Sequence, residues 1–266
     1  MAGAKRADRA CKRGRRLSEA AQLWGGADYD GIAPFYAPIY DDLIARLAPQ
    51  RGERFLDVAT GTGEVALRAV RAGAEVTALD IAPAMLELAR AKPGSESIRF
   101  DLGDARALPY EDSAFDVLAS NFGVIFVPDR DVVARELARV CRSGGRLALT
   151  AWYSKPQLDE IYERFGRTSS VDSSVWSDAE ELERLFGDAF ELELHDRVWY
   201  LEGASGEDVF EFWSRTAPPM KAYLESLDGD ARAQVRAALV EYWEGFHDGE
   251  RVREPRPYVV VLGWRR

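Results

Sequence analysis

Residues 55–67 read FLDVATGTGEVAL. An apolar run ends at Asp57, turns through Gly61 and Gly63, and then opens an amphipathic helix. The stretch therefore predicts a strand, a tight turn and a helix N-terminus, as at the first strand of a doubly wound sheet. Glycine at the turn permits left-handed backbone angles and lets a ligand approach the main chain closely. Helix N-termini in this position present free N–H groups to ligands.

A second apolar run, residues 75–79, ends at Asp80, 19 residues after Gly61. A carboxylate there can accept hydrogen bonds from both hydroxyls of a ribose. The two segments together predict a site for an adenosine-containing ligand. Residues 61–66, GTGEVA, also satisfy the dinucleotide pattern G-x-G-x-x-G/A, which is a weak signal when it stands alone.

The acidic residues beside the turn favour one kind of adenosine compound. Asp57 precedes the turn and Glu64 opens the helix. Negative charge there would repel a pyrophosphate but suits a ligand with an ammonium and a sulfonium. The segment resembles the first motif of class I S-adenosylmethionine (SAM)-dependent methyltransferases, which has the form aspartate–x–x–x–glycine–x–glycine.

Four later segments resemble further motifs of that family in the expected order, although Ser143 stands where family members have proline. The likeness covers roughly residues 51–152 and is closest to ubiquinone- and menaquinone-biosynthesis enzymes and bacterial small-molecule methyltransferases. The segments are 80–85 (DIAPAM), 101–109 (DLGDARALP), 115–121 (FDVLASN) and 136–147 (ELARVCRSGGRL).

The resemblance implies a cofactor site built from the turns that follow the strands. Ile81 and Met85 would flank the adenine, with ordinary helix–sheet packing as their alternative. Asn121 would end the fourth strand at the mouth of the cleft, unless it only forms a turn. The expected cofactor-binding residues are Asp57, Ala59, Gly61, Gly63, Asp80, Ile81, Met85, Asp104, Ala105 and Asn121.

Three aspartates have specific roles under this resemblance. Asp57 would anchor the methionine ammonium, directly or through water, or would merely cap the turn. Asp80 would bind the ribose. Asp104 would bind the adenine amino group, although Asp101 is three residues away and is an alternative for that role.

We expect an α/β fold with a doubly wound, mostly parallel seven-stranded sheet and a helical cap. Strands are predicted near 53–58, 75–80, 97–101, 115–120, 145–151, 190–195 and 257–264, and helices near 63–72, 82–92, 130–142, 158–165 and 177–186. The last of these helices would begin with a capping box from Ser177 to Glu180. The expected organisation is a basic disordered tail (1–16), N-terminal helices over the cofactor site (17–50), a SAM-binding Rossmann-like core (51–204), a helical cap (205–250) and a final strand (251–266).

The methyl acceptor is expected to lie under the cap. Tyr29, Tyr36, Trp213 and Trp243 are candidate substrate-binding residues, because ligand pockets are lined mainly by such side chains. Core packing is the alternative for each of them. His247 is the candidate general base, since histidine titrates near neutrality and the residue lies on the predicted cap. A surface histidine beside Asp248 is the alternative reading.

Composition limits the other function classes. The net charge is −10, and residues 1–16 alone carry +6, so the remainder carries −16 and would repel a nucleic-acid backbone. Residues 120–123, SNFG, also differ from the Asn/Asp-Pro-Pro-Tyr/Phe motif of amino-group DNA and RNA methyltransferases. We expect no membrane span, no metal site, and a cytoplasmic protein, since the two cysteines suggest neither a disulfide nor a metal site. The oligomeric state is left open.

The sequence therefore predicts a SAM-dependent methyltransferase that acts on a small apolar or aromatic metabolite by in-line methyl transfer. Alignment of acceptor and methyl carbon can supply ~7–11 kcal/mol, so no nucleophilic side chain is required. Two alternatives remain. One is an NAD(P)-dependent oxidoreductase that uses the same glycine turn, and the other is a non-catalytic SAM-binding regulatory protein.

Overall fold

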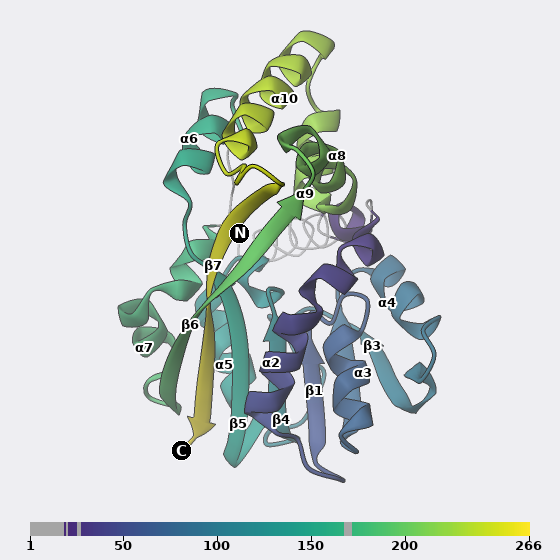
Figure 1. The fold of residues 1–266 in the computed structure, drawn as a ribbon. Helices are drawn as coiled ribbons and strands as arrows, with labels where there is room; N and C mark the ends of the chain where they lie inside the picture. The colour runs from purple at the N-terminus through teal and green to yellow at the C-terminus, as the bar shows by residue number, and fades with distance from the viewer. Residues whose placement is uncertain (1–18, 20, 26–27, 168–171) are drawn as a thin grey trace, which may run out of the picture.

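The fold is described from a computed structural model, which places residues 19, 21–25, 28–167 and 172–266. The expected basic tail, residues 1–16, lies outside this part of the chain. One seven-stranded sheet has the order β3-β2-β1-β4-β5-β7-β6, in which β7 runs in the direction opposite to the other six strands (Figure 1). The predicted sheet is confirmed. Its strands are β1 (Arg54–Val58), β2 (Glu75–Asp80), β3 (Ile98–Leu102), β4 (Phe115–Asn121), β5 (Cys141–Trp152), β6 (Phe190–Gly203) and β7 (Val252–Arg265).

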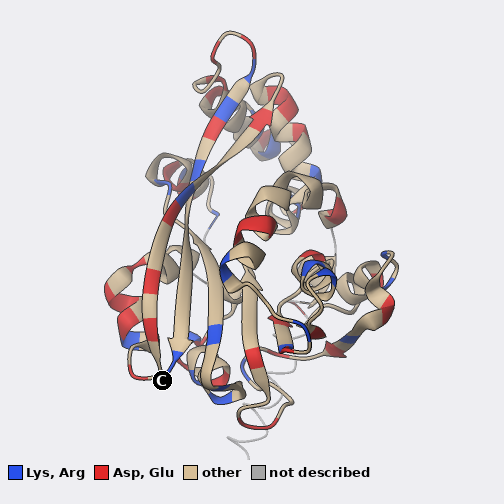
Figure 2. Cartoon of the chain, turned by 60° about the horizontal axis from the view of Figure 1, so that its bottom comes forward, with Lys and Arg blue, Asp and Glu red and all other residues tan. Residues whose placement is uncertain are grey.

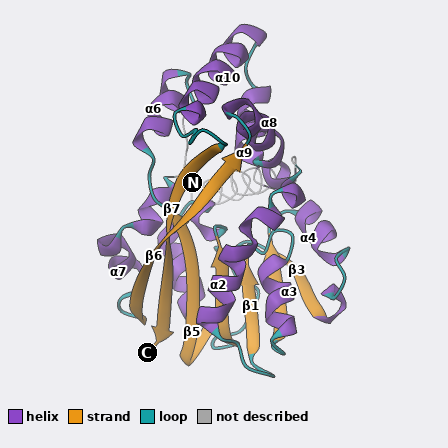
Figure 3. Cartoon of the chain, viewed as in Figure 1, coloured by secondary structure: helices purple, strands orange, loops and turns teal. Residues whose placement is uncertain are grey.

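Helices cover both faces of the sheet (Figure 3). α2 and α3 lie over one face and α5 lies over the opposite face (Figure 1). The α-helices are α2 (Ala37–Leu47), α3 (Glu64–Arg71), α4 (Pro83–Arg90), α5 (Arg130–Val140), α6 (Pro156–Arg164), α7 (Ala179–Phe186), α8 (Gly206–Thr216), α9 (Pro218–Glu225) and α10 (Gly229–Glu244). Short 3₁₀ turns are η1 (Tyr29–Gly31), η2 (Ala33–Tyr36), η3 (Ser95–Ser97), η4 (Val124–Phe126) and η5 (Ser173–Ser177).

The central strands are apolar because both of their faces are covered. Phe55 and Leu56 of β1 and Val117 and Leu118 of β4 are fully buried, as expected for parallel strands between two helical layers. Leu43 of α2 is likewise fully buried. This packing fixes the carboxyl ends of β1 and β4 relative to each other.

The last two strands are longer than the sequence suggested. β6 and β7 pair over their whole length, from Phe190–Arg265 to Gly203–Val252, and this hairpin reaches past the rest of the sheet into the cap (Figure 1). Acidic and basic residues alternate on its far part (Figure 2), where Glu202 pairs with Arg253 at 2.9 Å. The prediction of strands over only 190–195 and 257–264 was therefore too short.

Two prolines near the start of β7 explain why this part of the strand was not predicted from the sequence. Pro255 and Pro257 lack an N–H and suit a strand only where one side has no partner. The pairing of β5 with β7 stops at Trp152–Tyr258, so both prolines lie beyond the end of β5. Here β7 has only β6 as a neighbour, and the sheet opens beside Arg256.

Four helices form the helical cap, which we define as α6, α8, α9 and α10. They lie beyond the carboxyl ends of the parallel strands (Figure 1), and α10 packs against both α6 and α8. The Tyr223 hydroxyl of α9 donates a hydrogen bond to the Phe165 carbonyl at 3.0 Å. α6 was assigned to the core from the sequence, but it completes the cap. No helix in the described ranges has the length and apolarity that crossing a membrane requires.

Two helix boundaries also differ from the prediction. α7 begins after Asp178, whose carboxylate accepts the Glu181 N–H at 2.8 Å, so the expected capping box at Ser177 and Glu180 was wrong by one residue. α5 ends at Val140, and residues 141–144, expected in a helix and turn, already belong to β5. Phe115 pairs with Cys141 across an irregular register, which draws this segment into the sheet.

Candidate functional site

The turns after β1 and β4 meet where the chain order of the sheet reverses. Open α/β sheets bind ligands at this switch point. Ala59 and Phe122 follow these two strands and both have left-handed φ angles, 55° and 50°. A Cβ on Gly123 would lie only 2.5 Å from the Ala59 Cβ. Strained backbone of this kind persists only where the surroundings enforce it, and it is concentrated at ligand sites.

Gly123→Ala is expected to destabilise the fold by about 1–3 kcal/mol, because the new methyl group would overlap Ala59. Ala59 has little freedom to move, since its own backbone is strained. Urea unfolding measures the change. Gly229→Ala is the matched control, because nothing lies within 4 Å of a Cβ there. Equal stability of the two variants would show that the turns do not pack as described.

A cavity of about 650 Å³ opens at these strand ends, within the usual range for small-ligand sites. We call it the strand-end cavity. It is lined by most of the residues predicted to bind the cofactor, which come from the ends of β1, β2, β3 and β4 and, for Met85, from α4. These are Ala59, Gly61, Asp80, Ile81, Met85, Asp104, Ala105 and Asn121.

Asp80 connects two of the turns. Its carboxylate accepts the Gly61 N–H at 2.8 Å and the Ala82 N–H at 2.9 Å. Burial raises the pKa of this carboxyl, although the backbone hydrogen bonds oppose the shift. Two carboxylate oxygens offer about four acceptor sites, so the group can accept further donors from the cavity.

Asp57 and Gly63 were expected at the ligand but do not line the strand-end cavity. Asp57 is buried beneath the loop, where its carboxylate accepts the Thr60 hydroxyl at 2.6 Å and the Ala66 N–H at 3.1 Å. Burial raises its pKa to about 7. Gly63 instead permits close helix packing, since a Cβ there would lie 3.1 Å from the Ala89 Cβ. Direct contact of Asp57 with a ligand is not supported, and its position shows that it holds the loop.

Asp104 and Asp101, the two candidates for binding the adenine amino group, differ in their position relative to the cavity. Asp104 lines the cavity and accepts hydrogen bonds from the Arg106 side chain at 3.1 Å. Asp101 is not among the lining residues and accepts the Tyr110 hydroxyl at 3.1 Å. Asn121 is fixed through its side-chain oxygen, which accepts the Thr150 hydroxyl at 3.0 Å.

The charge of Glu64 is less influential than the sequence suggested. Its carboxylate contacts Arg68 at 2.7 Å and Lys92 at 2.8 Å. These two cations offset the negative charge that was expected to repel a pyrophosphate. Glu64 by itself therefore does not exclude a dinucleotide from this turn.

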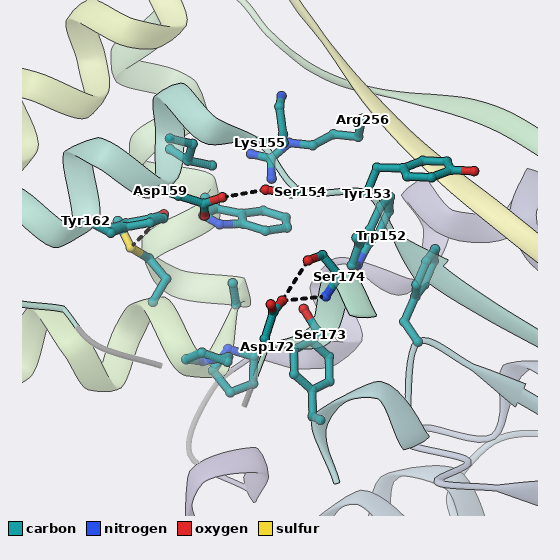
Figure 4. Close-up of a pocket in the computed structure, with 18 of the residues that line it drawn as sticks. Trp152, Tyr153, Ser154, Lys155, Asp159, Tyr162, Asp172, Ser173, Ser174 and Arg256 are labelled. Carbon is teal, nitrogen blue, oxygen red and sulfur yellow. Dashed lines mark hydrogen bonds between the residues drawn. The ribbon is translucent and has the colours of Figure 1, made fainter. Parts of the chain in front are cut away.

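A second cavity, of about 540 Å³, lies between the strand ends and the cap (Figure 4). We call it the aromatic cavity. Phe122 stacks on Trp152 with ring centroids 3.8 Å apart, and Tyr36 meets Trp199 edge-on at 4.8 Å. The two cavities share a wall, so ligands in them would be neighbours. The shared residues are Trp24, Tyr29, Phe122, Phe126, Arg167 and Pro219.

Three of the four predicted substrate-binding residues reach the aromatic cavity. Tyr36 and Trp213 line it, and Tyr29 lies in the shared wall with its ring against Gly61. Trp243 was predicted wrongly: it is fully buried, and its indole N–H donates to Glu254 at 2.9 Å.

The prediction for His247 is also not supported. This residue lies in the turn after α10, away from the lining of both cavities, and its Nδ1 accepts the Gly249 N–H at 3.0 Å. It is a surface turn residue because the cap presents α6, α8 and α9 to the cavity rather than the end of α10. Among the described residues, no group of three or more histidine, cysteine or acidic side chains is arranged to hold a metal ion.

Comparison with known proteins identifies the central part of the chain. Residues 56–149 match the methyltransferase domain family. These residues include the two turns and most of the strand-end cavity. They form a class I SAM-dependent methyltransferase domain.

The methyltransferase domain has named relatives. Over 137 residues it is 40% identical to the methyltransferase GfsG of Streptomyces halstedii, covering 50% of this chain and 49% of that protein. Over 158 residues it is 37% identical to the ubiquinone/menaquinone biosynthesis C-methyltransferase UbiE of Rhizobium etli, covering 54% and 61%. The chain thus spans about half the length of the curated relatives it matches first.

The fold extends beyond the part that matches in sequence. Phosphoethanolamine N-methyltransferase 2 of Haemonchus contortus, solved with SAM, superimposes over 86% of this chain and 52% of that one, with a TM-score of 0.55 and 16% identity. At that identity the likeness concerns the fold alone.

Several residues that line the cavities around the methyltransferase domain were not predicted from the sequence. Phe122 directly follows β4 and Trp152 is the last residue of β5, and this position at the carboxyl ends of two strands could have identified them. Trp199, Lys155 and Arg256 also line the aromatic cavity. They were missed because the extension of β6 and β7 into the cap has no clear pattern in the sequence.

Proposed function

We propose that this protein transfers a methyl group from SAM to a small acceptor held in the aromatic cavity. One observation carries the proposal: the strand-end cavity, which gathers eight residues expected at the cofactor, shares a wall with a cavity rich in aromatic side chains. The family of the domain supports SAM as the cofactor. SAM, when bound, supplies an electrophilic methyl group on a sulfonium.

The residues of the strand-end cavity fit such a cofactor. Asp80 offers acceptor sites for a ribose, and Gly61, with a φ of 55°, brings the main chain close to the ligand. Ile81 and Met85 offer apolar surface to an adenine. Asp57 acts on the cofactor indirectly, because its hydrogen bonds to Thr60 and Ala66 hold the loop in place.

The aromatic cavity orients the acceptor and excludes water. Tyr29 and Phe122 stand in the shared wall, where the reacting atoms of two neighbouring ligands would meet. Burial raises the pKa of Tyr29 to about 12, so its hydroxyl stays protonated and serves as a hydrogen-bond donor rather than a base. Aromatic faces also attract a sulfonium, by ~0.5–2 kcal/mol. Catalysis then depends mainly on alignment.

Calorimetric titration of the whole chain with S-adenosylhomocysteine (SAH), NADH and NADPH tests the cofactor. We expect SAH alone to bind. Binding of a nicotinamide nucleotide instead would contradict the proposal and favour an oxidoreductase that uses the same glycine turn. A binding protein without turnover is separated from an enzyme by supplying methyl-labelled SAM with a pooled mixture of small aromatic compounds and measuring label transfer.

A further inference from the structure

The aromatic cavity has a cationic end that methyl transfer itself does not require. Lys155 and Arg256 both line it, and Figure 4 shows their side chains beside each other. Their side chains are only 15% and 12% exposed. Charged side chains are rarely buried to this degree unless a partner is present, so their partners decide how much charge is left for a ligand.

One buried carboxylate faces these two cations. Glu254 is fully buried and is contacted by Lys155 Nζ, while its oxygens accept Arg256 Nε–H at 2.9 Å, the Tyr242 hydroxyl at 2.7 Å and the Trp243 indole N–H at 2.9 Å. Burial alone would raise its pKa, but Arg256 and Lys155 outweigh burial and hold the pKa below its ordinary value. Glu254 is therefore ionised, and its acceptor sites are taken by these donors.

The cluster of Lys155, Arg256 and Glu254 carries one positive charge in excess, while Arg167, which also lines the cavity, lies apart from the cluster with its guanidinium 4.1 Å from the centre of the Tyr162 ring. Arg256 Nη2 is buried and lies 2.8 Å from Glu254, but it makes no hydrogen bond there. The guanidinium also lies 5.2 Å from the centre of the Trp213 ring. Three acids line the same cavity, namely Asp159, Glu163 and Asp172, but all three are exposed, where solvent screens their charge.

The arrangement of β5 and β7 places Arg256 at the cationic end of the aromatic cavity. Pro255 and Pro257 occupy the part of β7 that has no β5 neighbour, and Arg256 lies between them. Lys155 follows the end of β5 on the other side of the same opening, where its ammonium donates to the Pro255 carbonyl at 2.9 Å. The separation of β5 from β7 thus brings two cations to one end of an otherwise aromatic cavity.

We propose that the acceptor carries a carboxylate, which Arg256 and Lys155 bind at the cationic end while the aromatic walls hold the rest of the molecule. This inference rests on the proposed function, since it names the class of acceptor: an aromatic or apolar carboxylic acid. A carboxylate is favoured over a phosphate because a single excess charge matches a monoanion. A planar guanidinium also suits the two oxygens of a carboxylate.

Matched probes test the charge without knowing the natural acceptor. Calorimetry compares 2-naphthoate with 2-naphthamide and benzoate with benzamide, each with and without saturating SAH. The members of each pair have nearly the same shape and differ in charge. We expect the carboxylate to bind at least about tenfold more tightly, as for a hydrogen-bonded charge pair. Arg256→Gln is expected to reduce that preference to near parity.

Two further variants keep the test independent of folding. The triple variant Lys155→Gln, Glu254→Gln and Arg256→Gln removes all three charges of the cluster, leaves none of them unpaired, and is expected to give the same loss of preference. Arg253→Gln is the matched control, because Arg253 lies on the same strand, pairs with Glu202 and does not line the cavity. Its preference for the carboxylate should equal that of the unmodified protein.

The outcomes separate this inference from the proposed function. Equal binding of carboxylate and amide by the unmodified protein overturns the inference, as does failure of every probe to bind. A preference that survives in both Arg256 variants also overturns it. SAH binding is read in the same titrations: if SAH does not bind, the proposed methyl transfer fails, whereas carboxylate recognition by Arg256 is judged by the probe pairs alone.

Discussion

Asp80→Ala is expected to weaken SAH binding by about 100-fold or more. In the proposed site, the Asp80 carboxylate accepts hydrogen bonds from two ribose hydroxyls. Each hydrogen bond to a charged group contributes about 1.5–3 kcal/mol. The substitution also removes the acceptor of the Gly61 and Ala82 N–H groups, which hold the turn against the cavity. Both effects reduce affinity. Calorimetric titration with SAH measures the loss.

Two variants separate ligand binding from general damage. Asp80→Asn keeps an acceptor oxygen for one backbone N–H but removes the charge, so it should show a smaller loss than Asp80→Ala. Asp101→Ala is the matched control, because Asp101 lies on the neighbouring strand β3 and does not line the strand-end cavity. Unchanged SAH affinity in Asp80→Ala would refute the assignment of the ribose site.

The residues that line the strand-end cavity could largely be predicted from the sequence, because they come from short local segments. Strand, turn and helix follow one another within a few residues, and parallel strands place their carboxyl ends at one edge of the sheet. Ala59, Asp80, Asp104 and Asn121 therefore converge as predicted. Asp57 and Gly63 were the exceptions, since the motif does not show which of its residues face the cavity and which pack beneath the loop.

The aromatic cavity, in contrast, depends on contacts between distant segments. Arg256 lies beside Lys155 because β7 extends beyond the end of β5. No sequence pattern indicates this extension, and the two prolines in it argue against a strand. Trp243 and His247 were chosen because they lie on the predicted cap. The orientation of α10, which buries Trp243 and leaves His247 outside, follows from its packing on α6 and α8 and cannot be read from the helix alone.

Asp57→Asn is expected to remove a pH dependence of stability. Burial raises the pKa of Asp57 to about 7 from an ordinary 3.8. Between these values the folded protein holds a proton that the unfolded chain has lost. The contribution of Asp57 to stability is therefore complete below about pH 4 and is lost as the pH rises towards 7. At 1.36 kcal/mol per pH unit, the loss amounts to at most about 4 kcal/mol.

Asparagine resembles the protonated carboxyl, because its side-chain oxygen can still accept the Thr60 hydroxyl and the Ala66 N–H. Urea unfolding at pH 4.5, 6 and 8 measures the free energy of unfolding of both proteins. The variant should gain stability relative to the unmodified protein as the pH rises, while Asp101→Asn, outside the loop, should not. Parallel curves for Asp57→Asn and the unmodified protein would show that Asp57 titrates normally. The loop would then have to hold an ionised carboxylate, and its burial beneath the turn would need another explanation.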